Sequence, residues 1–255
     1  MNRIPTAAIV FMVAAMTARA EEFNSDRPGI ADGAETVGRG RVQLEAGLQH
    51  DRRKPGDEPR RETFLPTLLR IGVADEWEAR LESDLYSWMR DSEGARSEAW
   101  APFALGLKHQ FREGDGVGPS LGAIVSISPP SGSGSLRQRH TTGEVRLLAE
   151  WEFGERWSIN PNIGFGYEED DEGERFSTRI FAATLAYRPQ TRLELALDVG
   201  AQRPETPGGH TAVLSSASIA YKVKRELQVD FAFGGRSAGS TLPHRFVAGG
   251  FSARF

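Results

Sequence analysis

Apolar and polar residues alternate along almost the whole of this chain, and this pattern limits the possible folds more than any other feature. In residues 193–202 the odd positions are Leu, Leu, Leu, Val and Ala, whereas the even positions are Glu, Ala, Asp, Gly and Gln. A period of two places successive side chains on opposite faces of a β-strand. The alternation predicts strands at 41–50, 62–73, 77–86, 99–111, 119–128, 143–153, 157–167, 176–187, 193–202, 211–221, 227–234 and 244–255. The sequence therefore predicts an all-β fold of about twelve strands, an even number of the kind found in membrane barrels.

The connections between these strands indicate which face of the sheet meets water. Short connections at 74–76, 112–118, 154–156, 188–192 and 222–226 alternate strictly with long ones at 51–61, 87–98, 129–141, 168–175, 203–210 and 235–243. Strict alternation places every short turn at one rim and every long loop at the other. Outer-membrane barrels have this asymmetry, with short periplasmic turns and long external loops. We therefore predict a transmembrane antiparallel up-and-down β-barrel over residues 41–255, with its apolar face toward lipid.

The N-terminus predicts export. Arg3 gives a positive start, Ala7 to Met16 are mostly apolar, and Ala18-Arg19-Ala20 has small residues where a signal peptidase cleaves. We interpret residues 1–20 as a cleaved signal peptide; the alternative is a buried N-terminal helix. Together with the barrel, the signal predicts the outer membrane of a Gram-negative cell.

Composition excludes several other classes. No apolar run after the N-terminus reaches the roughly 18 residues of a membrane helix. A net charge of −4 gives no sign of a nucleic-acid partner. The chain has no cysteine, and its five histidines are scattered without metal-ligand spacing, so we expect neither cofactor nor metal.

Aromatic residues gather beside the predicted short turns. Trp77, Trp151, Trp157 and Tyr187 lie on the apolar parity at strand ends, which is typical of an interfacial girdle in contact with membrane lipid. Phe255 ends the last strand on the same parity and rim. We interpret it as the terminal signal for the barrel assembly machinery.

The opposite parity carries charge and predicts the lining of the lumen. The candidate lumen residues are Glu45, Arg70, Arg80, Glu82, Asp84, Arg146, Glu150, Asp198 and Asp230, with Glu144, Glu152 and Glu194 on the same parity. Facing lipid, a cation would cost about 2–4 kcal/mol near the midplane, so this parity is assigned to the interior. Two interpretations remain: the charges pair across strands and fill a narrow bore, or they line a path with mild cation preference. Inward glycines, such as Gly47, Gly72, Gly106, Gly164 and Gly200, favour a lumen that is open or poor in side chains in places, which favours a channel.

Residues 21–40 form a separate segment without alternation, rich in Gly and with one Pro. Such composition marks irregular structure without saying where it lies. The segment is either a periplasmic lead or an inward plug, in which Asp26 and Arg27 would join the charges of the lumen.

Several short motifs resemble one family. They are Phe23-Asn24-Ser25-Asp26-Arg27-Pro28-Gly29, Gly40-Arg41-Val42-Gln43-Leu44-Glu45-Ala46-Gly47, Leu68-Leu69-Arg70-Ile71-Gly72 and Gly106-Leu107-Lys108. Over essentially the whole mature chain, the sequence resembles the outer-membrane transporter family associated with the meta-cleavage pathway of phenol degradation. The resemblance implies a monomeric barrel that passes small aromatic or apolar compounds.

Three functions follow from these observations. The first is a channel for small molecules, with outer-membrane lipid and lipopolysaccharide as its surroundings. The second is a closed barrel with a structural or surface-interaction role. An outer-membrane phospholipase is a minor alternative, but His140 is followed by Thr141, Thr142 and Gly143, not by the His-x-Ser-Asn-Gly pattern of those enzymes. We therefore expect no enzyme.

Overall fold

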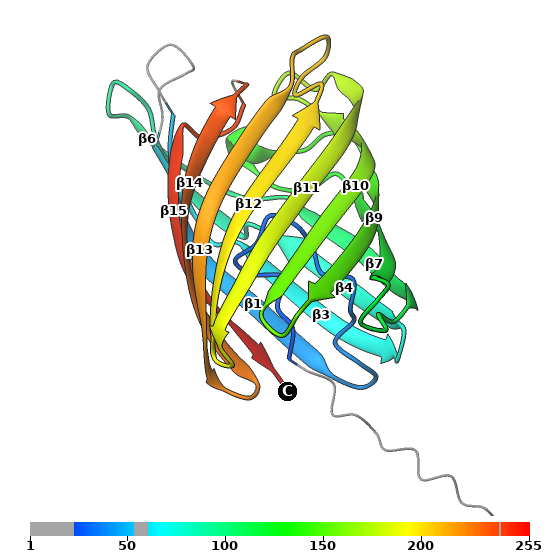
Figure 1. The fold of residues 1–255 in the computed structure, drawn as a ribbon. Helices are drawn as coiled ribbons and strands as arrows, with labels where there is room; N and C mark the ends of the chain where they lie inside the picture. Colours follow the sequence, from blue (N-terminus) through cyan, green and yellow to red (C-terminus); the bar gives the residue numbers. More distant parts are fainter. Residues whose placement is uncertain (1–22, 54–60, 240) are drawn as a thin grey trace, which may run out of the picture.

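The computed structural model describes residues 23–53, 61–239 and 241–255, so the predicted signal peptide lies outside the described residues. The described part is a single antiparallel sheet that curls into a barrel (Figure 1). Its strands are β1 (Val42–Arg52), β2 (Arg61–Phe64), β3 (Thr67–Ala74), β4 (Trp77–Ser83), β5 (Tyr86–Arg90), β6 (Arg96–Trp100), β7 (Phe103–Arg112), β8 (Ser120–Ser128), β9 (Thr142–Phe153), β10 (Trp157–Glu169), β11 (Arg175–Gln190), β12 (Leu193–Arg203), β13 (Ala212–Lys224), β14 (Leu227–Ala238) and β15 (Arg245–Arg254). A 3-10 helix, Gly134–Leu136, lies in the connection between β8 and β9.

The barrel closes by pairing the first strand with the last. β1 and β15 are antiparallel over ten residue pairs, from Gln43 opposite Arg254 to Arg52 opposite Arg245. The backbone N–H of Phe255 also donates to the carbonyl of Val42 at 2.8 Å. The fold-class prediction of a closed antiparallel barrel of twelve strands is confirmed.

Fifteen segments make twelve barrel strands because three strands are interrupted. β1 pairs with β3 along one half and with β2 along the other, and β4 and β5 continue the next strand in the same way. β6 and β7 form the third interrupted strand. Two of the breaks contain Pro66 and Pro102, which have no N–H to donate to a sheet. The third contains Leu85, whose φ of 47° lies outside the strand region.

One predicted long loop is largely a hairpin. The sequence predicts a loop at 87–98, but β5 and β6 pair from Tyr86 opposite Trp100 to Arg90 opposite Arg96. The alternation in fact continues through Trp88 and Arg90. Only the tight turn between Asp91 and Ala95 interrupts it, where Gly94 has a φ of 90°.

The two faces of the wall are inverted relative to a soluble protein. Outward side chains such as Ile163, Leu197 and Phe233 are large, apolar and more than half exposed. Inward Glu45 and Arg70 are almost completely buried. An apolar outer face is what a lipid environment requires. Among the described residues, no helix is long and apolar enough to cross a membrane.

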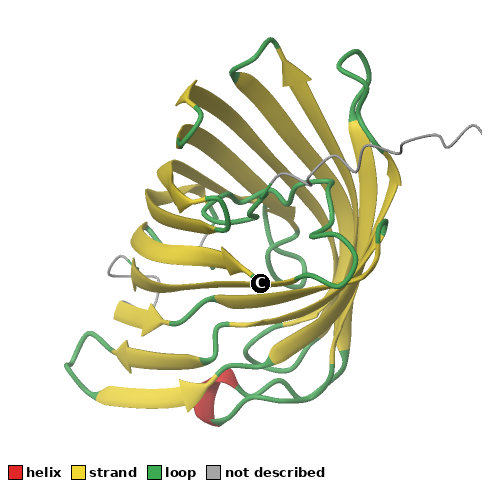
Figure 2. Ribbon diagram, turned by 90° about the horizontal axis from the view of Figure 1, so that it is seen from below, coloured by secondary structure: helices red, strands yellow, loops and turns green. Residues whose placement is uncertain are grey.

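Residues 23–40, here called the N-terminal segment, run without regular structure inside the barrel. Figure 2, viewed along the barrel, shows irregular chain within the ring of strands. At the short-turn rim, the backbone N–H of Gly40 donates to the carbonyl of Gly72 at 2.8 Å, and Thr36 donates to the carbonyl of Asp75 at 2.7 Å. The wall therefore surrounds a second layer made by the chain's own beginning.

Candidate functional site: the lumen and the N-terminal segment

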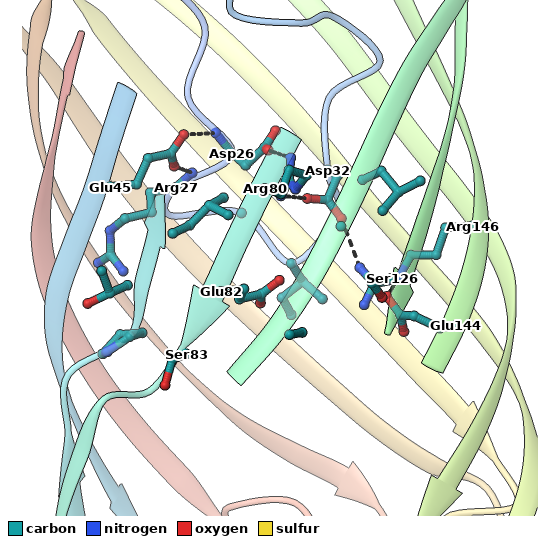
Figure 3. A pocket seen from close by; sticks show the side chains of 18 of the residues that line it. Asp26, Arg27, Asp32, Glu45, Arg80, Glu82, Ser83, Ser126, Glu144 and Arg146 are labelled. Atoms are coloured by element: carbon teal, nitrogen blue, oxygen red, sulfur yellow. Dashed lines mark hydrogen bonds and ion pairs between the residues drawn. The ribbon is translucent and has the colours of Figure 1, made fainter. Parts of the chain in front are cut away.

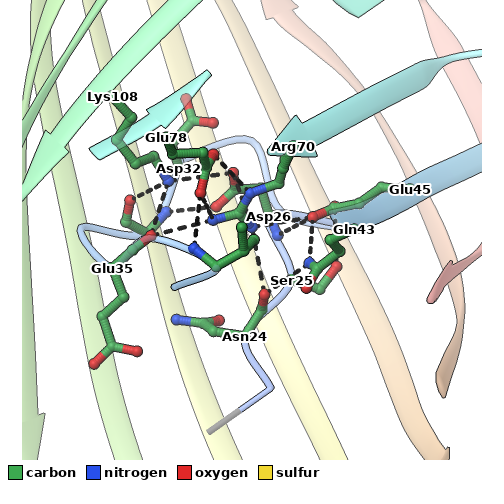
Figure 4. A network of polar contacts seen from close by, with 12 residues as sticks. Asn24, Ser25, Asp26, Asp32, Glu35, Gln43, Glu45, Arg70, Glu78 and Lys108 are labelled. Atoms are coloured by element: carbon green, nitrogen blue, oxygen red, sulfur yellow. Dashed lines mark hydrogen bonds and ion pairs between the residues drawn. The ribbon is translucent and has the colours of Figure 1, made fainter. Parts of the chain in front are cut away.

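Asp26 of the N-terminal segment lies among three cations of the barrel wall (Figure 4). Its Oδ2 is 2.7 Å from Nη1 of Arg80, 3.4 Å from Nη1 of Arg70 and 3.5 Å from Nζ of Lys108. These three cations come from β4, β3 and β7, which are neighbours in the sheet. All four side chains are almost or completely buried. One carboxylate of the segment is thus held by three adjacent strands.

Glu78 on β4 neutralises the same cations from the wall. Its two carboxylate oxygens accept from Nε and Nη2 of Arg70 at 2.8 and 2.9 Å, a bidentate pair. Its Oε1 also accepts from Nη1 of Arg80 at 3.1 Å. The second oxygen accepts from the backbone N–H of Val37 at 3.0 Å, so Glu78 binds wall and segment together.

Glu45 on β1 holds the segment by its backbone. Its Oε2 accepts from the N–H of Arg27 at 2.9 Å and from the hydroxyl of Ser25 at 3.0 Å. Its Oε1 accepts from Nη1 of Arg70 at 3.1 Å. The cluster contains equal numbers of opposite charges: Arg70, Arg80 and Lys108 against Asp26, Glu45 and Glu78.

Asp32 links this cluster to the next strands (Figure 3). Its two oxygens lie 2.9 Å from Nη2 of Arg80 and 2.8 Å from Nη1 of Arg146 on β9. Arg146 also forms an ion pair with Glu144 at 2.8 Å. The amide of Asn162 on β10 meets the backbone of Asp32 twice, accepting from its N–H at 2.8 Å and donating to its carbonyl at 3.0 Å. Side chain and backbone of Asp32 are therefore both fixed.

Arg27 lies across the seam where the barrel closes. Its guanidinium pairs with Asp230 on β14 through two hydrogen bonds of 2.9 and 3.2 Å. Gly47 and Gly250 face each other across β1 and β15, and a Cβ on either would overlap the Arg27 guanidinium. Because neither glycine has a side chain, the guanidinium can pack against the seam.

Further contacts extend around the ring. Glu150 on β9 accepts from the N–H of Ala34 at 3.1 Å, and Asp198 on β12 accepts from the N–H of Ile30 at 3.2 Å. The hydroxyls of Ser25 and Ser252 on β15 are 2.6 Å apart. The segment is thus bonded to strands on every side of the barrel.

The chain end of β15 meets the start of the described segment. The guanidinium of Arg254 lies 5.6 Å from the ring centre of Phe23, which is buried. The same guanidinium donates to Glu226 in the short turn between β13 and β14 at 2.6 Å. This hydrogen bond lowers the pKa of Glu226 below its ordinary value.

The inward glycines receive the segment and luminal side chains. A Cβ at Gly72 would overlap the backbone of Gly38, and one at Gly200 would lie 2.9 Å from Cγ2 of Ile30. A Cβ at Gly164 would lie 2.9 Å from Cγ of Arg146. The sequence interpretation that inward glycines leave the lumen open therefore differs from the structure, in which the chain itself uses that room.

Two cavities of the lumen lie on either side of the N-terminal segment. The larger, about 260 Å³, is lined by Glu82, Asp84 and Glu144 together with Leu68 and other residues (Figure 3). These residues lie toward the long loops. The smaller, about 40 Å³, is lined by Arg188, Glu194 and Ser158, near the short turns. Asp26, Arg27, Gly29 and Ala31 line both cavities, so the segment is the partition.

The structure places the predicted lumen residues in two positions. Those in contact with the segment are Glu45, Arg70, Arg80, Arg146, Glu150, Asp198 and Asp230, which meet Asp26, Arg27 and their neighbours. Glu82 and Asp84 face the larger cavity instead. Phe255 lies on the outside at the short-turn rim, with 72% of its surface exposed.

Sequence reasoning missed Glu78, Lys108 and Asp32. Glu78 has the same parity as Arg80, and Lys108 has the parity opposite to Leu105 and Leu107, so parity alone could have assigned both to the lumen. Asp32 lies in a segment without periodicity and left no such signal. In the described part of the chain, no group of three or more His, Cys, Asp or Glu is arranged to hold a metal ion.

Comparisons with solved structures bear out the architecture. The outer-membrane channel COG4313 from Pseudomonas putida F1 superposes with a TM-score of 0.68 at 13% identity, covering 87% of this chain and 98% of that one. The NanC porin gives a TM-score of 0.56 at 10% identity, covering 83% and 98%. The translocator domain of the autotransporter NalP from Neisseria meningitidis gives 0.55 at 11%, covering 88% and 91%. At these identities the likeness shows the fold alone.

Sequence comparison is more specific. No curated protein matches the chain. A family model described as "Putative MetA-pathway of phenol degradation" matches residues 25–255, which include the N-terminal segment from Ser25 onward and the complete barrel. This confirms the resemblance seen in the motifs, and the chain belongs to that family.

Proposed function

We propose that the protein is an outer-membrane channel for small molecules whose N-terminal segment closes the lumen at rest. Two arguments support the channel: membership of a family described by phenol degradation, and the likeness in fold to an outer-membrane channel. The permeants would be small aromatic compounds such as phenols.

The observation that carries the gate is the partition. Two cavities on either side of the segment share four of its residues as lining, so displacing the segment would join them into one path. The larger cavity offers polar groups of Arg80 and Ser126 beside apolar Leu68 and Ile124. A phenol presents one hydroxyl and an apolar ring, and this mixture fits it.

Asp26 is the residue through which we expect the gate to respond. Its carboxylate is the segment's share of the neutral cluster, so Asp26→Asn leaves Arg70, Arg80 and Lys108 with one negative charge too few. Excess buried positive charge weakens the hold on the segment. It also makes the lumen more attractive to anions.

The test measures conductance in planar bilayers and the flux of phenol across liposome membranes. It compares four proteins: the unmodified chain, a deletion of residues 24–38, Asp26→Asn and the control Asp171→Asn. Asp171 is exposed in a long loop. We expect larger conductance and faster flux in the deletion, more frequent opening and a reversal potential shifted toward anions in Asp26→Asn, and no change in the control. Unchanged conductance and flux in the deletion would reject the gated channel.

A permanently closed barrel is the second candidate. The observation in its favour is the number of wall strands that bond the segment, which resembles a structural core more than a mobile gate. If the deletion fails to fold and every folded variant is electrically silent, this candidate is the better one.

The setting of the barrel is part of the proposal. We infer an outer-membrane location with export by residues 1–20, insertion by the barrel assembly machinery with Phe255 as its signal, and a monomer. An epitope inserted after Gly94, in the β5–β6 turn, should label on intact cells. Labelling only after permeabilisation would mean that the barrel has the opposite orientation in the membrane.

A further inference from the structure

Five arginines form a continuous row on the outer surface of the barrel, at the long-loop end. Arg245 on β15 pairs with Arg52 on β1, Arg52 with Arg61 on β2, Arg61 with Arg90 on β5, and Arg90 with Arg96 on β6. Five neighbouring strands thus each contribute an arginine to one row that runs across the sheet. At about 4.8 Å between strands, the row is about 19 Å long.

The arginine row points outward. Along β1, β5 and β15, its members share the parity of exposed Leu48, Trp88 and Val247. All five arginines are exposed. In Figure 1, the β5–β6 hairpin projects from the barrel at the upper left, on the side where β15 lies.

Within the described residues, little acidic charge lies near the arginine row. None of the five side chains makes a hydrogen bond or an ion pair with a residue in the part of the chain that the structure describes. On the outer face of these strand ends, Glu98 is the one acidic residue among those described, leaving a net charge of +4, five minus one. Like charges directly opposite each other destabilise a sheet, so a row of four consecutive arginine pairs favours the binding of anions.

The position of the arginine row relative to the membrane indicates which anion it binds. Trp88 is the next outward residue after Arg90 in the direction of the membrane, about 7 Å away along β5. The next outward residues beyond Trp88 are Tyr86 and Trp100, whose ring centres are 4.9 Å apart. Aromatic side chains on a lipid-facing surface mark the level of the headgroups. A row of guanidiniums just outside that level faces the phosphates of the lipid.

We propose that the arginine row binds the phosphate groups of lipopolysaccharide in the outer leaflet, with the acyl chains against the apolar wall below. A guanidinium binds phosphate in a bidentate manner. A row this long suits a glycolipid that carries several phosphates, whereas a free phosphate ion would touch only two neighbours. A shorter arginine pair, Arg179 with Arg203, exists on β11 and β12, but it lacks this extent. The inference rests on the outer-membrane location proposed above, not on channel activity.

The test measures binding of purified, folded barrel in neutral detergent to diphosphorylated lipid A, with fully dephosphorylated lipid A, phosphatidylglycerol vesicles and inorganic phosphate as comparison ligands. The variant is the triple substitution Arg61→Gln, Arg90→Gln and Arg96→Gln. The matched control is Arg156→Gln, Arg192→Gln and Arg225→Gln, three exposed arginines in the short turns.

We expect the row variant to bind lipid A at least about tenfold more weakly than the unmodified protein, and the control to bind as the unmodified protein does. Binding should also weaken as salt rises. Equal binding by the row variant, or equal binding of dephosphorylated lipid A, would overturn the proposal. Equal affinity for phosphatidylglycerol, or displacement of lipid A by millimolar phosphate, would overturn the assignment to lipopolysaccharide. If the triple variant does not fold, Arg90→Gln alone should weaken binding by about threefold, and an unchanged affinity would reject the site.

Discussion

Arginines inside this barrel and arginines on its outer surface live under opposite conditions. Arg70 and Arg80 are buried, and each lies within 3.5 Å of carboxylates from two different strands or segments. Arg90 and its neighbours in the arginine row are exposed and stand opposite one another, with no carboxylate partner in the part of the chain that the structure describes. The interior charges form ion pairs within the chain, whereas we expect the exterior charges to bind anions from the surroundings. Charge alone therefore does not reveal the role of an arginine; its partners do.

The largest difference should appear when a partner is removed from the interior. Glu78→Ala leaves Arg70 and Arg80 buried with less compensation and removes the acceptor of the Val37 N–H. Breaking a buried pair in this way costs about 3–5 kcal/mol. Unfolding in urea of the detergent-solubilised barrel measures this loss.

The control for Glu78→Ala is Glu93→Ala. Glu93 is exposed in the β5–β6 turn, and its replacement should change the free energy of unfolding by no more than about 0.5 kcal/mol. Equal stability of the two variants would mean that the interior cluster is solvated and the contrast with the outer surface is false.

A smaller effect should come from the seam. Arg27 and Asp230 form a bidentate pair from the N-terminal segment to β14, beside the junction of β1 and β15. A double-mutant cycle of Arg27→Ala and Asp230→Ala should give a coupling of about 1–3 kcal/mol in the free energy of unfolding. Additive effects would contradict the pair. The control is Glu194→Ala. Glu194 is a luminal carboxylate that pairs with Arg188, so this substitution should show no coupling to Arg27→Ala.

The sequence predicts the wall of this molecule better than its contents. Period two fixed the parity of each strand, and with it the inward position of Arg70 and Asp198, because a strand's two faces follow directly from the order of residues. The segment around Asp32 has no period, and its position depends on ion pairs between residues up to 203 positions apart. No local pattern encodes such contacts. The arginine row could not be predicted from the sequence for a related reason. Its members lie far apart in the chain, and only the register of five strands aligns them.

The smallest effect is expected on the outer surface, and its sign is the informative part. Arg90 stands between Arg61 and Arg96, so Arg90→Gln removes two unfavourable pairings of like charges and breaks no hydrogen bond or ion pair among the described residues. In detergent free of lipid A, this variant should be as stable as the unmodified barrel or slightly more stable, and adding salt should stabilise the unmodified barrel more than the variant because salt screens repulsion. With lipid A present, the order should reverse, since a ligand that binds the folded state stabilises it more when it binds more tightly. Thermal unfolding of both proteins with and without lipid A measures the four values. A loss of stability in the lipid-free sample would mean that Arg90 already has a partner within the protein, and the division between a self-sufficient interior and a surface that requires lipid would fail.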